Sequence, residues 1–173
     1  MHAYLLELAS LMAVFSFAIV APGADTAMVM RQAMVHGRRA AILTSIGIGT
    51  SLMFHVTYTI LGLGLIISQS LLLFAIIKWV GAAYLVYMGV MALRAGATDL
   101  SPASGEADAP RQSAFRAFGL GFLANALNPK PVLFFLSIFS ALVSASTPGT
   151  VKFGYGLVMA SCLIAWFVGV SFF

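Results

Sequence analysis

The chain has 173 residues, of which 61% are hydrophobic and only 8% are charged, and its formal net charge is +4. This composition excludes an ordinary water-soluble domain and predicts an integral membrane protein. The nine Lys and Arg residues form no basic stripe, so nucleic-acid binding is not expected.

Five apolar segments follow one another along the chain, each long enough to cross about 30 Å of hydrocarbon as a helix. The first carries Glu7 and has no basic start, so we interpret it as a retained span and not as a secretory signal. A polar interval, 95–116, cannot bury a core and links a first repeat, 1–94, to a second, 117–173. The predicted fold is therefore an all-α polytopic membrane protein. Its segments cover 3–21 with a continuation to about 36, then 40–67, 71–94, 117–145 and 150–173.

The distribution of Lys and Arg predicts the orientation of these spans. Basic residues cluster in the loop 31–39 and flank the interval 95–116, so both are expected to be cytoplasmic. The N-terminus is then periplasmic. The first and fourth segments consequently run in opposite directions, which predicts an inverted repeat of three helices plus three.

Two motifs interrupt the helical pattern, one over 22–26 (PGADT) and one over 125–131 (NALNPKP). A proline inside a helix removes a hydrogen bond and pushes the preceding residue out of helical geometry. We therefore expect the first and fourth helices to be broken, with new half-helices starting near Asp25 and Pro131. Their unpaired N–H groups would suit a substrate carboxylate, and Lys130 adds a full positive charge there.

The depth of the two breaks follows from the rise of a helix, about 1.5 Å per residue. Counting inward from Arg116 places Asn128 roughly 18 Å from the cytoplasmic interface, near the midplane. Asp25 has a similar depth if the segment after it re-enters the membrane. If 3–21 spans alone, Asp25 lies at the inner surface instead.

Several polar side chains have alternative interpretations. Asp25 or Thr26 binds substrate or only caps the second half-helix. His55 exchanges protons, because imidazole titrates near neutrality, or bonds to a backbone carbonyl. Lys78 snorkels outward or reaches an internal acid or the substrate. The candidate substrate- or ion-binding residues are Pro22, Gly23, Asp25, Thr26, His55, Lys78, Asn125, Asn128, Pro129 and Lys130, and no metal-ligating set and no cofactor site is predicted.

Pairs of glycines recur within the apolar segments. Small residues let membrane helices approach closely, and Gly-x-Gly is no nucleotide fingerprint in this context. We assign a packing role to Gly47, Gly49, Gly62, Gly64, Gly119 and Gly121.

Four stretches in this order resemble the LysE/RhtB amino-acid exporters. They are the motif 22–26, the loop 37–40 (GRRA), Lys78 with the segment 81–85 (GAAYL), and the segment 121–130, which begins with Gly-Phe and ends with Asn-Pro-Lys. The resemblance covers nearly the whole chain. It implies a bacterial inner-membrane secondary transporter that exports amino acids with the proton motive force. The site residues carried over by motif are Pro22, Gly23, Asp25, Asn128, Pro129 and Lys130.

The resemblance also implies six spans, whereas five are present before the chain stops at Phe173. Ala24 stands where the family motif usually has a second proline. The predicted function is export of a small amino acid or related zwitterion, with protons as the coupling ion and a homodimer as a possible assembly. A metal or cation exporter and a non-transporting membrane subunit remain alternatives, and no enzyme is expected because no catalytic motif is present.

Overall fold

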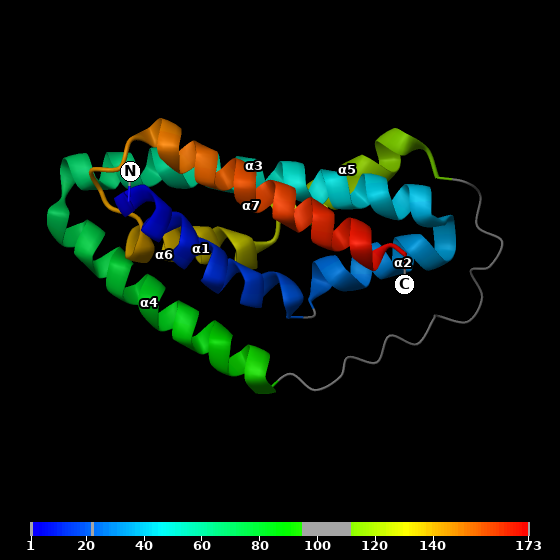
Figure 1. Ribbon diagram of the computed structural model, residues 1–173, viewed down its shortest axis with the longest axis horizontal. Helices are drawn as coiled ribbons and strands as arrows, with labels where there is room; N and C mark the ends of the chain where they lie inside the picture. Colours follow the sequence, from blue (N-terminus) through cyan, green and yellow to red (C-terminus); the bar gives the residue numbers. More distant parts are fainter. Residues whose placement is uncertain (1, 22, 95–111, 173) are drawn as a thin grey trace.

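The computed structural model describes residues 2–21, 23–94 and 112–172. Within these ranges the chain forms helices and no strands, and the long helices lie side by side along the length of the molecule (Figure 1). The helices are α1 (His2–Val20), α2 (Ala24–His36), α3 (Arg38–Gln69), α4 (Leu71–Arg94), α5 (Ala114–Ala126), α6 (Pro129–Leu142) and α7 (Gly149–Val170).

The membrane-spanning capacity of these helices agrees with the sequence. Four helices, α1, α3, α4 and α7, are each long and apolar enough to cross a membrane alone. The pair α5 and α6 passes the same test together, although its axis bends by 59° at the break. The predicted all-α membrane fold is therefore confirmed, and the inverted relation of the two repeats stays a prediction.

The two halves of the sequence interleave in space. Figure 1 shows α3, α5 and α7 along one side of the molecule and α1, α4 and α6 along the other. Helix α3 packs mainly on α5 and α7, whereas α4 packs mainly on α6. One apolar core draws on both halves, and its most buried side chains include Leu11, Ile48, Leu52, Ile138 and Met159.

The contact between α3 and α5 is close because glycines lie in it. A Cβ atom on Gly121 would fall on the backbone carbonyl oxygen of Thr44, and one on Gly47 would fall on that of Phe118. The Thr44 hydroxyl also donates a hydrogen bond to the Ala117 carbonyl across this contact, at 3.0 Å. The packing role expected for these two glycines is confirmed.

Only some of the glycines that were expected to pack against a neighbouring helix do so. A Cβ atom on Gly49 would overlap the Ile164 side chain, so this position is also tight. At Gly62, Gly64 and Gly119 an added Cβ meets nothing within 4 Å. The prediction was wrong for these three because glycine spacing does not reveal which helix face meets a neighbour.

A carboxylate joins the start of the first helix to the second half of the chain. Glu7 in α1 accepts hydrogen bonds from the Ser144 backbone N–H at 3.0 Å and the Thr147 hydroxyl at 2.9 Å. It also accepts one from the Tyr155 hydroxyl at 3.0 Å. Glu7 thereby fixes the N-terminal end of α1 against the segment between α6 and α7 and against α7 itself.

The outer face of α4 is apolar and exposed. Leu71, Leu72 and Val86 are among its exposed side chains, and Trp79 is 76% exposed. In a bilayer such a face is covered by lipid at little cost, because hydrocarbon is as apolar as these side chains.

Candidate functional site

The first helix break separates α1 from α2. Helix α2 is preceded by Gly23, whose backbone is extended with φ −155° and ψ −173°, and no side chain caps this end. Asp25 and Thr26 lie in the first turn of α2 and do not cap it, so the capping interpretation of these residues was wrong. Pro22, predicted to cause the break, lies outside the described residues.

The second break separates α5 from α6. Asn128 caps α6, because its side-chain oxygen accepts a hydrogen bond from the Lys130 backbone N–H at 3.0 Å. Pro129 is the first residue of α6, where a missing N–H costs nothing. The prolines therefore begin a new helix here, as the sequence predicts.

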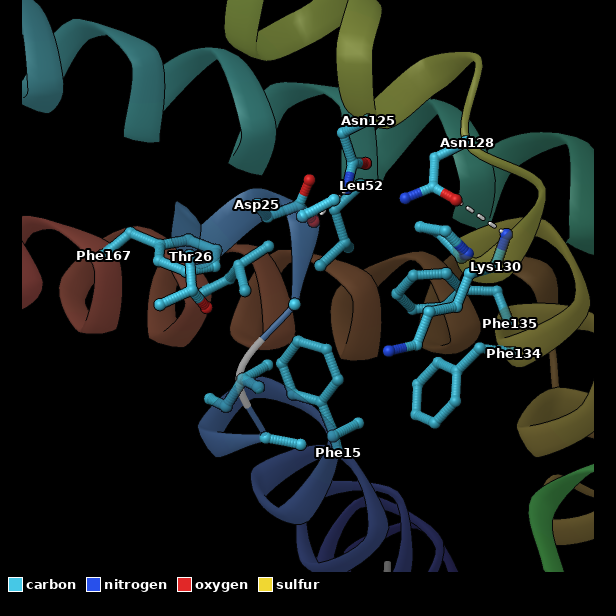
Figure 2. A pocket seen from close by; sticks show the side chains of 17 residues that line it. Phe15, Asp25, Thr26, Leu52, Asn125, Asn128, Lys130, Phe134, Phe135 and Phe167 are labelled. Carbon is cyan, nitrogen blue, oxygen red and sulfur yellow. Dashed lines mark hydrogen bonds between the residues drawn. The ribbon is translucent and has the colours of Figure 1, made fainter. Parts of the chain in front are cut away.

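The two breaks open onto one cavity of about 250 Å³ (Figure 2). Its polar lining comes from α2, from α5 and from the start of α6, and its apolar lining comes largely from α1, α6 and α7. The polar residues are Asp25, Thr26, Asn125, Asn128 and Lys130, and the larger apolar ones are Phe15, Ile19, Leu52, Phe134, Phe135, Leu163 and Phe167. Six of the ten predicted site residues, Gly23 with the five polar ones, thus meet at a single cavity.

Asp25 and Lys130 are the charged residues among those that line this cavity. The Lys130 ammonium nitrogen lies 3.8 Å from the position that a Cβ atom on Gly23 would take, so it approaches the α1–α2 break. Among the described residues no salt bridge joins Asp25 to Lys130, although the positive charge of Lys130 acts on the Asp25 carboxyl group through space. The cavity therefore has an anionic group and a cationic group that remain available to a ligand.

Hydrogen bonds join the two breaks. The Asn125 side-chain nitrogen donates to a carboxylate oxygen of Asp25 at 2.8 Å. Behind Asn125, His55 Nε2 lies 3.1 Å from both the side-chain and the backbone oxygen of that residue, and His55 Nδ1 lies 2.7 Å from the Tyr58 hydroxyl. His55 is completely buried and does not line the cavity, so the backbone-carbonyl interpretation of this residue agrees with the geometry.

Besides His55, two further predicted site residues are not part of the cavity lining. Lys78 is exposed on α4 and does not line it. Pro129 starts α6 next to it but is not part of the lining either. Asp25 itself lies beside the middle of the broken α5–α6 pair, since its partner Asn125 is near the end of α5.

The sequence analysis did not predict the aromatic lining of the cavity. Phe134 and Phe135 follow the second break by one turn of helix, and both pack against Phe15 with ring centroids 6.3 and 6.2 Å away. Because they are close to the break in the sequence, they could have been predicted to lie near the cavity. For Leu163 and Phe167 on α7, nothing in the sequence pointed to the cavity.

The described residues contain no group of three or more His, Cys, Asp or Glu side chains that could hold a metal ion. Hard cations need several oxygen ligands, and Asp25 is the one carboxylate in the cavity lining. The alternative of a metal exporter is therefore not favoured.

Comparison with known proteins shows the family to which the chain belongs. The family model described as LysE type translocator matches residues 16–173. The homoserine/homoserine lactone efflux protein of Salmonella typhimurium is 35% identical over 130 residues, which cover 75% of this chain and 61% of that protein. The threonine efflux protein of Escherichia coli is 31% identical over 157 residues, which cover 89% of this chain and 75% of that protein.

An uncharacterized membrane protein of Bacillus subtilis is 37% identical over 131 residues, which cover 73% of this chain and 62% of that protein. The chain thus spans less than two thirds of the length of the Bacillus protein and of the homoserine efflux protein. No solved structure matches the chain. Two of these relatives are named as efflux proteins. From the family model and these identities together, the chain belongs to the LysE type translocator family.

Proposed function

We propose that this chain exports a small neutral amino acid or related zwitterion from the cytoplasm across the bacterial inner membrane, coupled to the proton motive force. The observation that carries the proposal is the cavity between the helix breaks, which has one carboxylate and one ammonium group between apolar walls. The relatives named for homoserine and threonine efflux support this substrate class.

The charged groups divide the substrate between them. The Lys130 ammonium and the uncapped N-terminus of α2 attract the substrate carboxylate, since both present positive charge at the α1–α2 break. The Asp25 carboxylate attracts the substrate ammonium group. Charge-assisted hydrogen bonds of this kind are about twice as strong as neutral ones, so the zwitterionic end dominates the affinity.

The walls of the cavity set the side-chain preference. The rings of Phe15, Phe134, Phe135 and Phe167 supply an apolar surface, and Thr26 supplies one hydroxyl group. Among the residues that the structure describes, no second carboxylate lines the cavity to pair with the side chain of lysine or arginine. We therefore expect short neutral side chains to be preferred over cationic ones.

The charge distribution along the chain gives the orientation of the spans, and the efflux relatives support the direction of transport. The basic loop 31–39 and the interval 95–116 remain on the cytoplasmic side by the positive-inside rule, and the N-terminus is periplasmic. Asp25 binds the substrate ammonium group from the cytoplasm and a proton from the periplasm. Exchange of these two cations on one carboxylate gives proton-coupled export. Association of two chains into a homodimer stays a prediction.

A matched pair of lysine variants tests the anion-binding half of the site. In proteoliposomes loaded with radiolabelled threonine or homoserine, Lys130→Gln is expected to weaken the apparent affinity by about tenfold or more, because a charged hydrogen-bond donor is lost. Lys78→Gln makes the same change outside the cavity and is expected to leave the affinity unchanged. The reverse order of the two variants would move the anion site to α4.

The unmodified chain provides the test against a non-transporting subunit. A subunit would show neither efflux in proteoliposomes nor a change in melting temperature with amino acids. A transporter is stabilised by its substrate, since a ligand that binds only the folded state raises the melting temperature.

A further inference from the structure

The hydrogen bonds behind the cavity determine where protons lie. His55 Nε2 has two neighbours, the side-chain oxygen and the backbone oxygen of Asn125, each at 3.1 Å. Carbonyl oxygens only accept hydrogen bonds, so Nε2 must carry a proton. If the ring is neutral, Nδ1, which lies 2.7 Å from the Tyr58 hydroxyl, is then the acceptor and Tyr58 is the donor.

The same logic applies to the Asn125 amide, which has one accepting end and one donating end. Because its oxygen receives the His55 proton, its nitrogen must point to Asp25, where it donates at 2.8 Å. Turned by half a rotation, the amide would place its oxygen against the Asp25 carboxylate, and two acceptors would face each other. The His55 proton therefore selects the orientation in which Asn125 supports the negative charge of Asp25.

The surroundings of His55 hold the ring in this place. The ring is completely buried on α3 and stacks on Phe135, with centroids 6.0 Å apart and planes 10° apart. Phe135 in turn lines the cavity. A rigid, dry setting of this kind keeps one tautomer because a flipped ring would leave buried polar atoms without partners.

We propose that His55 and Tyr58 are positioning residues of the substrate site. The two Asn125 oxygens keep the proton of His55 on Nε2, and Tyr58 donates to His55 Nδ1 and holds the ring in place. His55 keeps the donating end of Asn125 on Asp25, and Asp25 is left with its second carboxylate oxygen for the substrate ammonium group. Neither His55 nor Tyr58 touches the substrate. This inference rests on the proposed function, because it assigns the roles of residues behind the same cavity.

A pair of substitutions at His55 separates the donated proton from the volume of the ring. In His55→Gln the amide nitrogen lies as many bonds from the backbone as Nε2 does, so it can still donate to Asn125. His55→Leu has a side chain of similar size without a donor. Binding is measured on the full chain as threonine-induced and homoserine-induced thermal stabilisation.

We expect His55→Gln to bind threonine within about threefold of the unmodified chain and His55→Leu to bind it about tenfold or more weakly, as loss of a hydrogen bond within a charged network implies. Equal weakening by both substitutions at an unchanged melting temperature overturns the positioning role, and so does unchanged binding by His55→Leu.

A spectroscopic measurement tests the proton placement even if a variant does not fold. The chain has three histidines, so selective ¹⁵N labelling gives few signals, and His55→Gln assigns the one of interest. We expect a neutral ring protonated at Nε2 at neutral pH, and the same tautomer in Tyr58→Phe because the Asn125 oxygens still face Nε2. A ring protonated at Nδ1, or at both nitrogens, contradicts the proposal.

Failure of the proposed function and failure of the positioning role of His55 give different experimental results. If the unmodified chain responds to neither threonine nor homoserine, the proposed substrate class is wrong while the tautomer result still decides the orientation of Asn125. If the unmodified chain responds and the His55 variants behave alike, the transport function stands and the positioning role falls.

Discussion

Replacing Asp25 with Asn is expected to abolish efflux driven by a pH gradient and to weaken binding of threonine by at least about tenfold, since a charge-assisted hydrogen bond is lost. Asn is nearly the same shape and can still accept the hydrogen bond that Asn125 donates at 2.8 Å. The fold should therefore survive, and the loss should come from the charge itself. Efflux of radiolabelled threonine from proteoliposomes, with and without a pH gradient, measures both effects.

Asp25→Glu is the matched control for this experiment. It retains the carboxylate and lengthens the side chain by one methylene group, so we expect partial transport that still responds to the pH gradient. Transport by Asp25→Asn at the unmodified rate, with the same response to pH, would remove Asp25 from the mechanism and leave Lys130 as the charged residue of the cavity.

Replacing Gly121 with Ala is expected to destabilise the fold by about 3 kcal/mol, at the upper end of the usual cost of overpacking. The added methyl group would meet the carbonyl oxygen of Thr44, with the Thr44 carbonyl carbon at 2.9 Å, and backbone atoms cannot rotate away. Helices α3 and α5 must then separate, which also lengthens the hydrogen bond from Thr44 to Ala117. For a chain of this size the melting temperature should fall by about 6–12 °C.

Gly119→Ala gives the control on the same helix, because a Cβ atom there meets nothing within 4 Å. We expect an unchanged or slightly higher melting temperature, since Ala favours helix more than Gly does. Substrate binding should also separate the two variants, because Asn125 lies one turn beyond Gly121 and depends on its distance to His55 on α3. Equal melting temperatures for the two variants would show that the α3–α5 contact is loose.

Local chemistry explains which parts of the site could be predicted from the sequence. Proline removes a backbone hydrogen bond and clashes with the preceding turn of a helix, so the break before Pro129 could be predicted from the sequence alone. The length of the apolar segments could also be predicted from the sequence alone. A charge placed beside such a break is expensive in hydrocarbon, which is why the positions of Asp25 and Lys130 in the sequence marked them as candidate site residues.

Contacts between distant segments could not be predicted in this way. Asp25 and Asn125 are separated by 100 positions, and no pattern in either motif says that the two side chains meet. Lys78 and Lys130 both look like buried cations in sequence, yet only the fold distinguishes the exposed face of α4 from the cavity. Asn128 lines the cavity and also caps α6 with its side chain, and the sequence did not predict this second role.

The interleaving of the helices has a consequence for how the chain can be divided. A cut within the interval 95–111 would separate α3 from α5 and α7, and α4 from α6, which are the main helix contacts of the molecule. The first fragment would also lose the partners of Glu7, all of which belong to residues 144–155. Neither fragment would contain a core of its own, so the two would have to insert into the same membrane and reassemble there. The chain is therefore one cooperative unit built from two sequence halves, and its halves are not separable modules.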